Sequence, residues 1–400
     1  MPIMDPSKLE FFPWLAAAYA ISIYAFLFAL ATLQLRFSLF SGSLTKTSGR
    51  YGSIDGLRGL LATGVLIHHS FTAYGYFSSG SWKWSTSPLL NQLGQTTVAM
   101  FFMITGFLFT IKASRPQINW TALYKSRIAR LVPLYGILVV VVFGLVLFLS
   151  GGELKESPGR LVTEFFQWFT FVCFGRPDIN AFPLTWTIVA GVNWSLAYEV
   201  IFYISCIPLI HLAAKYCSNQ TLLIFYTVLL LGLLGHRSLN STGSASPSLY
   251  AAHFLCGIVT AYAYNTPAIK LAIGTRTFKF IAIVALCSLL LATHSYSSWA
   301  VLSTMIIFAS IVGGTSVFGL LNTKAAIWLG DISYGIYLLH GILLWVSLSM
   351  VITPHGLIQF NLTSYWLLVL AISTCVITLA SLSYVKLERP AMLWFASKER

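Results

Sequence analysis

Charge is what this sequence has least of. Of its 400 residues only 9% are charged, and Asp and Glu together number 11. Hydrophobic residues make up 57% of the chain. Soluble globular domains carry about 25% charged residues, so this composition excludes that class and predicts a membrane protein.

The chain also has few cysteines, and its six copies lack the paired spacings typical of metal sites. Most lie in apolar stretches, where a thiol behaves as a small hydrophobic side chain. We therefore expect no disulfide, no zinc site and no other bound metal. Internal repeats, low-complexity tracts and a separate soluble domain are missing as well, and the longest polar connection covers roughly residues 151–194.

In place of these features the chain has long apolar stretches. A membrane-spanning helix needs about 20 predominantly apolar residues. The pattern predicts an all-α polytopic membrane protein with eleven spans. The expected spans cover residues 11–35, 57–77, 95–111, 131–150, 195–213, 221–236, 248–264, 279–294, 299–321, 332–352 and 365–385.

Two apolar stretches need separate interpretation. The first span has no flanking basic run or cleavage-like site, so we expect a retained helix and not a cleaved signal peptide. The stretch 160–175 is broken by Glu164 and Gln167 and predicts an interfacial or re-entrant segment. The expected domains are an N-terminal helix with a cytoplasmic linker (1–50), a membrane core (51–390) and a cytoplasmic tail (391–400).

The net charge of +13 raises nucleic acid as a partner. Threading the eleven spans argues against it, because 18 of the 24 Lys and Arg residues fall on one side and six on the other. Basic residues gather on the cytoplasmic side of membrane proteins. The split predicts an N-terminus outside, a C-terminus in the cytoplasm and no nucleic-acid partner.

Arg58 and His69 are the first candidate catalytic pair. A helix turns about 100° per residue, so eleven steps return His69 to within about 20° of the face of Arg58. His68 is ten steps away and falls on the flank. Ionisable groups inside a membrane are costly and usually functional, and a neutral imidazole suits proton abstraction from a hydroxyl. The alternative is a snorkelling arginine and a hydrogen-bonded core histidine.

Arg127 and Arg130 are three residues apart at an expected cytoplasmic helix start, so they face one way. Paired guanidinium groups match phosphate oxygens, and with Lys125 they would hold a phosphorylated donor. Ordinary positive-inside flanking is the alternative.

Glu199 is the acidic residue that falls within an expected span, near its outer end and beside Trp194. Such an acid would orient a histidine or hold its proton. The alternative is an interfacial carboxylate in an aromatic belt.

Two further motifs have polar or small residues inside apolar runs. Thr105 and Gly106 either pack helices closely or let a thin pantetheine-like arm pass between them. Tyr334, Tyr337 and His340 are spaced by three and form a polar stripe on one helix, so His340 is either a site residue or a satisfied core histidine.

In this order, these motifs resemble those of the acyltransferase 3 family, integral membrane enzymes that use acyl-coenzyme A to modify glycans and other acceptors outside the cytoplasm. The resemblance covers roughly Gly52 to Pro390 and implies a ten-helix core preceded here by one extra helix. The matching positions are Arg58 and His69 (arginine, ten residues, histidine), Arg127 and Arg130 (Arg-x-x-Arg), Glu199 (Trp-Ser-Leu-x-x-Glu), Tyr334, Tyr337 and His340 (Ser-Tyr-x-x-Tyr-Leu-x-His) and Glu388-Arg389-Pro390.

The resemblance implies a membrane O-acyltransferase, expected to be an O-acetyltransferase of a bacterial inner membrane, with no tightly bound cofactor. Arg127, Arg130 and Arg58 would hold the coenzyme A phosphates, with Thr105, Tyr334 and His340 along the donor path. His69 would act as general base or carry the acyl group, with Glu199 near an acceptor arriving from outside. Thr105 stands where the family often has serine.

No esterase-like domain follows the last expected span, which favours a membrane-linked or diffusing acceptor over a distant polymer. A secondary transporter of a polar solute or glycan lipid is the main rival, because such proteins also keep His and Glu inside the membrane. Transporters often show two related halves and broken helices, and this sequence shows neither.

Overall fold

The computed structural model describes residues 13–44, 52–85, 87–240, 245–291, 296–357 and 359–397. Within these ranges the chain forms helices and no strand. A helix lies in each of the eleven expected spans, which confirms the all-α class. The helices at these spans are α1 (Pro13–Gln34), α3 (Gly52–Ser79), α4 (Pro88–Ala113), α5 (Trp120–Leu149), α7 (Trp194–Ile201) with η3 (Phe202–Cys206) and α8 (Ile207–Tyr216), α9 (Asn219–Leu239), α10 (Pro247–Tyr264), α12 (Arg276–Leu291), α13 (Ser298–Val312), α15 (Ser333–Val346) and α17 (Leu362–Ser383).

A helix that crosses a membrane must be both long enough and apolar enough, which not every helix in the expected spans is. In the described part of the chain seven helices meet both conditions, or eight if α11 (Pro267–Gly274) and α12, bent by 66°, form one span. The chain is thus a multi-pass membrane protein. The shorter elements are α2 (Ser38–Ser41), α6 (Pro158–Phe169), η2 (Thr185–Val189), η4 (Leu320–Asn322), α14 (Lys324–Asp331), η5 (Ser347–Val351), α16 (Thr353–Leu357), η6 (Tyr384–Glu388) and α18 (Arg389–Ser397).

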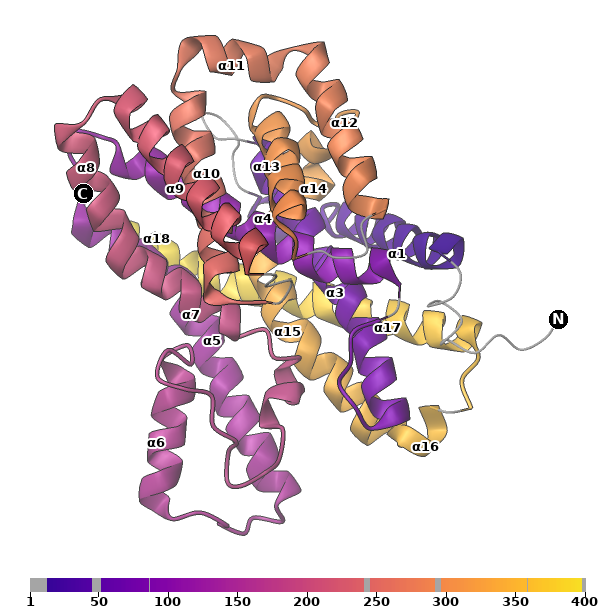
Figure 1. The fold of residues 1–400 in the computed structure, drawn as a ribbon. Helices are drawn as coiled ribbons and strands as arrows, with labels where there is room; N and C mark the ends of the chain where they lie inside the picture. Colours follow the sequence, from indigo (N-terminus) through magenta and orange to yellow (C-terminus); the bar gives the residue numbers. More distant parts are fainter. Residues whose placement is uncertain are drawn as a thin grey trace.

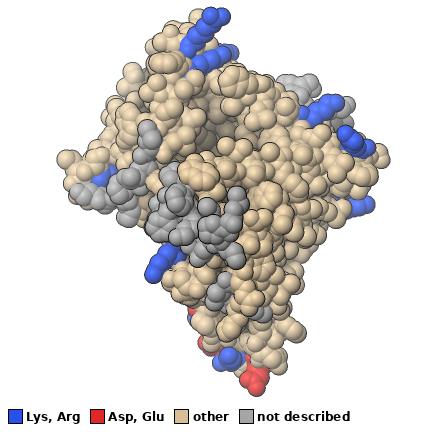
Figure 2. All heavy atoms as spheres, turned by 90° about the vertical axis from the view of Figure 1, so that its right-hand side faces the viewer, with Lys and Arg blue, Asp and Glu red and all other residues tan. Residues whose placement is uncertain are grey.

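Helices α3, α4 and α15 occupy the middle of the bundle, and the others surround them (Figure 1). The visible surface is largely uncharged, with Lys and Arg at its margins and Asp and Glu at the narrow end (Figure 2). A bundle that faces lipid has no need of surface charge, so the scarcity seen in the composition is a property of its exterior.

Close helix contacts in the core depend on missing side chains. Where α4 crosses α10, a Cβ at Gly106 would overlap the carbonyl oxygen of Phe254, and a Cβ at Gly257 would overlap that of Met103. The same holds where α14 meets α3, because a Cβ at Gly330 would overlap the backbone of Asp55. Small residues let helix backbones approach where lipid provides no hydrophobic drive.

Gly257→Ala is expected to destabilise the protein, because the methyl group cannot enter the α4–α10 contact without separating the helices. Overpacking of this kind costs about 1–3 kcal/mol. Gly232→Ala in α9 is the matched control, since its Cβ would meet nothing within 4 Å and alanine favours helices by about 1 kcal/mol. Melting temperatures in detergent should fall for Gly257→Ala only; equal melting of both variants would contradict the close contact.

Two expected spans differ from the helices observed. The α-helix of the span 299–321 ends at Val312, because Gly313 ends α13 and Gly314 has a φ of 101°, a left-handed conformation that favours glycine. The helix of 365–385 instead continues without a break through η6 into α18, as one apolar run from Leu362 to Phe395. Glu388 is therefore a second acid inside a spanning helix, and it is fully buried.

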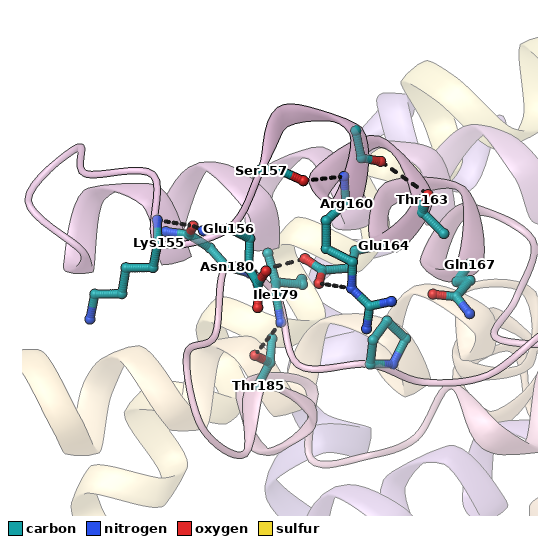
Figure 3. Close-up of polar contacts among 12 residues, drawn as sticks. Lys155, Glu156, Ser157, Arg160, Thr163, Glu164, Gln167, Ile179, Asn180 and Thr185 are labelled. Carbon is teal, nitrogen blue, oxygen red and sulfur yellow. Dashed lines mark hydrogen bonds and ion pairs between the residues drawn. The ribbon is translucent and has the colours of Figure 1, made fainter.

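The stretch 160–175 forms α6 and the turn after it, in a lobe at the projecting end of α5 (Figure 1). With 12 residues α6 is about 18 Å long and cannot cross a membrane. Inside the lobe the Glu164 carboxylate accepts hydrogen bonds from Arg160 Nε and the Asn180 backbone N–H, both at 3.0 Å (Figure 3). Asn180 Oδ1 accepts a hydrogen bond from the backbone N–H of Lys155 at 2.7 Å. Asn180 therefore links the loop after α6 to the segment that precedes this helix.

After this lobe the chain turns back into the bundle. The η2 residues Ile188 and Val189 are fully buried, and a Cβ at Gly341 of α15 would overlap the Val189 backbone. Because α7 starts only five residues after η2, it begins inside the bundle and not at its surface. The segment that turns back into the bundle is thus 185–193, and for 160–175 the interfacial alternative stays a prediction.

Segments predicted on the same side of the membrane lie together. On one side Ser53 Oγ donates to Asn322 Oδ1 at 3.0 Å, and Arg389 donates to the Gly42 carbonyl at 3.3 Å. On the other, the rings of Trp84 and Tyr296 are 6.2 Å apart. The alternation of spans predicted from the sequence therefore agrees with the fold.

Candidate active site

Two cavities lie along the inner face of α4, one near each end. The arginine cavity, of about 110 Å³, is lined by Arg58, Thr105, Arg127, Arg130, Glu199 and Tyr334, among others. The histidine cavity, of about 80 Å³, is lined by His68, His69, Gln95, Trp194, Tyr250 and His253, among others. Three residues, Val98, Phe102 and Tyr337, line both cavities and so form the wall between them.

Helix α3 connects the two cavities. Arg58 reaches the arginine cavity and His69 the histidine cavity, and both belong to this one 28-residue helix. Eleven residues of helix separate them by about 16 Å along the axis. The shared face inferred from their spacing thus runs along both cavities.

His69 and His340 form a hydrogen-bonded pair. His69 Nδ1 lies 2.9 Å from His340 Nε2, and His340 Nδ1 lies 3.0 Å from the Ile336 carbonyl oxygen. A carbonyl only accepts, so His340 Nδ1 carries the proton, and the Nε2 of a neutral His340 accepts from His69 Nδ1–H. This assignment leaves His69 Nε2 without a proton. The ring nitrogen available as a base in the histidine cavity is therefore His69 Nε2.

His340, which we expected along the donor path, is not among the residues lining either cavity and is hydrogen-bonded to His69, 271 positions away in the chain. Nothing in the local sequence around either residue indicates this pairing.

His68 lies in the same cavity but is held differently. Its Nδ1–H donates to the Leu90 carbonyl at 2.8 Å, and its ring packs so closely on Gly94 that a Cβ there would overlap it. His68 is 4% exposed, whereas His69 is half-buried at the cavity surface. Packing between α3 and α4 accounts for His68.

Two of the three arginines of the arginine cavity, Arg130 and Arg127, have different partners. Arg130 donates to the Asp331 carbonyl at 2.9 Å, and its Nε lies 3.9 Å from Glu388 Oε2. Arg127 stacks over the Phe109 ring at 5.3 Å, and its Nε donates to Ser126 Oγ at 3.4 Å. Arg130 therefore also joins α5 to α14 and η6, whereas the ring contact of Arg127 is with Phe109, which lines the same cavity.

Glu199 lies in the arginine cavity and not beside His69. Thr105 Oγ1 donates to its Oε1 at 3.0 Å, and Tyr203 OH donates to its Oε2 at 3.1 Å. Glu199 is the sixth residue of the apolar helix that runs from Trp194 to Tyr216, so it lies near one end of that span. It lines the arginine cavity and not the histidine cavity.

Two tyrosines of the polar stripe hold helices together at the cavities. Tyr334 OH donates to the Leu131 carbonyl at 2.7 Å on the arginine side. Tyr337 OH donates to the Val192 carbonyl at 3.0 Å and lies 2.7 Å from Ser195 Oγ. These bonds fix α15 against α5 and α7.

The sequence analysis did not identify several residues of the histidine cavity. Gln95, Tyr250, His253 and Tyr296 line it, and His253 is a buried histidine within the expected span 248–264. Its only signal was a histidine in an apolar run. Across the described ranges, no group of three His, Cys, Asp or Glu residues is arranged to hold a metal ion.

Comparison with known proteins places this arrangement in a family. A family model described as an acyltransferase domain matches residues 51–384. The chain is 24% identical over 380 residues to the peptidoglycan O-acetyltransferase OatA of Listeria monocytogenes, covering 86% of this chain and 56% of that protein. It is 23% identical over 372 residues to nodulation protein 10 of Rhizobium leguminosarum bv. viciae, covering 86% and 94%.

The chain thus spans a little over half the length of the Listeria protein. No solved structure matches it. The family match extends over most of the chain and includes both cavities and the histidine pair. The chain therefore belongs to the acyltransferase 3 family of membrane acyltransferases.

Proposed function

We propose that this protein moves an acyl group, an acetyl group in the simplest case, from cytoplasmic acyl-coenzyme A to a hydroxyl of a glycan or lipid-linked saccharide outside the inner membrane. The observation that carries the proposal is the unprotonated His69 Nε2, separated by a single layer of side chains from a cavity with three arginines. An acyl donor and a hydroxyl acceptor need these two environments next to each other.

The arginine cavity suits the donor. Coenzyme A carries several phosphate groups, and guanidinium groups bind phosphate with two parallel hydrogen bonds. Arg127 and Arg58 would bind these groups, and Arg130 would add charge while remaining tied to α14 and η6. Thr105 and Glu199 lie along the cavity toward the wall and would contact the polar arm of the donor.

The histidine cavity suits a saccharide acceptor. Its lining combines the rings of Trp84, Trp194, Tyr250 and Tyr296 with the polar side chains of Gln95 and His253. Aromatic faces with a few polar groups fit a sugar ring, which has apolar faces and a polar edge. Trp84 is 57% exposed and marks the rim by which an acceptor would enter.

Transfer then follows from the histidine pair. His69 Nε2 takes the proton of the acceptor hydroxyl while the hydroxyl oxygen attacks the thioester carbonyl. The carbon–sulfur bond breaks, and the thiolate leaves and takes the proton from His69. A second route has Nε2 attack first and carry the acyl group to the acceptor. In both routes the His69 ring is held by its bond to His340.

Release of free coenzyme A tests the proposal. Purified protein in proteoliposomes, given acetyl-coenzyme A and a saccharide acceptor, should release thiol and yield an acetylated product detectable by mass spectrometry. His69→Ala protein provides the background rate. A transporter would move solute without releasing any thiol, so thiol release equal to that background, with solute uptake, would favour the transporter instead.

The proposed sidedness makes a separate prediction. Lys155, whose side chain points away from its neighbours in the α6 lobe (Figure 3), would lie outside the cell, and Gln117, exposed between α4 and α5, in the cytoplasm. In a background without the six native cysteines, Lys155→Cys should react with an impermeant maleimide in intact spheroplasts. Gln117→Cys should react only after lysis. The reverse pattern would invert the topology and remove the cytoplasmic donor site.

A further inference from the structure

We propose that Val98, Phe102 and Tyr337 select the acyl group by its width, admitting unbranched short chains and excluding branched ones. This inference rests on the proposed function, because it concerns an acyl group that travels from the arginine cavity to His69. The three side chains are the ones that border both cavities, so an acyl group taking that path passes between them.

The order of residues on α4 defines the path. Val98, Phe102 and Thr105 are four and three positions apart, so they follow one face of the helix. Val98 and Phe102 border both cavities, and Thr105 borders only the arginine cavity. The thioester must bring its carbonyl carbon to His69 Nε2, and the acyl chain lies ahead of that carbon. The chain therefore passes the wall before the reacting atom does.

Phe102 cannot move aside easily. Its ring is 1% exposed and stacks on Phe254 at a centroid distance of 4.6 Å. Phe254 in turn stacks on Phe202 at 4.5 Å. Rotating the Phe102 ring out of the wall would break this stack inside a close-packed core. Phe102 is therefore a fixed side of the passage.

Tyr337 is fixed at its tip. Its hydroxyl is hydrogen-bonded to Ser195 and to the Val192 carbonyl, so the ring is held at the hydroxyl as well as at its attachment to the backbone of α15. Val98 differs from both aromatic residues because it is aliphatic and half-buried. The width of the passage is thus set by two rigid rings and one small side chain, and Val98 is the position at which that width can be changed.

The test compares acyl donors in variants that change the width in opposite directions. Thiol release is measured with acetyl-, propionyl- and isobutyryl-coenzyme A, and each result is expressed as a ratio of kcat/KM to the acetyl value. Val98→Ala should raise the isobutyryl ratio about tenfold or more, in the range that one methylene makes in an apolar pocket. Val98→Ile should lower the propionyl ratio. Because ratios are compared, partial loss of folded protein does not alter the result.

Ile104→Ala is the matched control, because Ile104 is on the same helix and borders only the arginine cavity. It should leave both ratios within about twofold of the unchanged protein. If the unchanged protein transfers acetyl groups but both Val98 variants keep its ratios, width selection is overturned and the proposed function stands. If the unchanged protein releases thiol from none of the three donors, both proposals fail.

Discussion

His69→Ala is expected to lower the rate of acyl transfer by about 10²–10⁴, the usual cost of removing a general base. The reason is that His69 Nε2 is the unprotonated ring nitrogen facing the acceptor cavity, given its bond to His340. Single-turnover transfer from acetyl-coenzyme A measures the loss. Melting temperature in detergent confirms that the variant is folded.

His68→Ala is the control for that result. His68 contacts the same cavity but is committed to the Leu90 carbonyl and to packing on Gly94. Its loss should reduce stability more than it reduces the transfer rate of the folded fraction. An inactive His68→Ala enzyme together with an active His69→Ala enzyme would exchange the roles of the two rings.

His340 is a positioning residue in the same argument. His340→Leu removes the acceptor for His69 Nδ1–H and should slow transfer, because the His69 ring is then free to adopt the other tautomer. His340→Gln keeps a side-chain oxygen that can accept this bond, so it should recover part of the rate. Equal rates for the two variants would mean that His340 acts only by filling space.

Arg127→Ala is expected to raise the KM for acyl-coenzyme A by about 10- to 100-fold, with a smaller change in kcat. A hydrogen bond to a charged group contributes about 1.5–3 kcal/mol, which corresponds to that range of affinity. Arg127→Lys should recover little, because an ammonium cannot form the paired bonds of a guanidinium. Steady-state kinetics at several donor concentrations separates KM from kcat.

Two further variants serve as comparisons for Arg127→Ala. Arg130→Ala should raise KM and also lower the melting temperature. The change removes the hydrogen bond to the Asp331 carbonyl and leaves the buried Glu388 carboxylate without its arginine partner. Arg115→Ala removes a basic residue from the same expected side of the membrane, at an exposed position. If Arg115→Ala and Arg127→Ala raise KM equally, the cluster serves topology and not donor binding.

The sequence could predict what depends on local pattern. Apolar length located a helix in all eleven spans, and the spacing of Arg58 and His69 along one helix followed from its pitch. Their placement needed no knowledge of the rest of the chain, because both belong to α3.

The contacts that the sequence could not predict are those between residues far apart in the chain. The His69–His340 pair joins two helices 271 positions apart. The hydrogen bond from Thr105 to Glu199 likewise joins α4 and α7 across 94 positions of the chain. Glu388 was recognised only as part of the Glu388-Arg389-Pro390 motif and not placed inside a span, because the helix continues beyond α17 through η6 into α18.

The wall of Val98, Phe102 and Tyr337 also has an electrical consequence. If the two cavities admit water from opposite faces, the membrane potential falls mainly across that thin layer and not across the full bilayer. Moving one elementary charge through 100 mV costs about 2.3 kcal/mol, in addition to the cost of removing it from water. A neutral acyl group incurs neither cost when it passes, whereas a proton or a sodium ion incurs both. The same side chains can thus let an acyl group pass from one cavity to the other while keeping the membrane closed to ions.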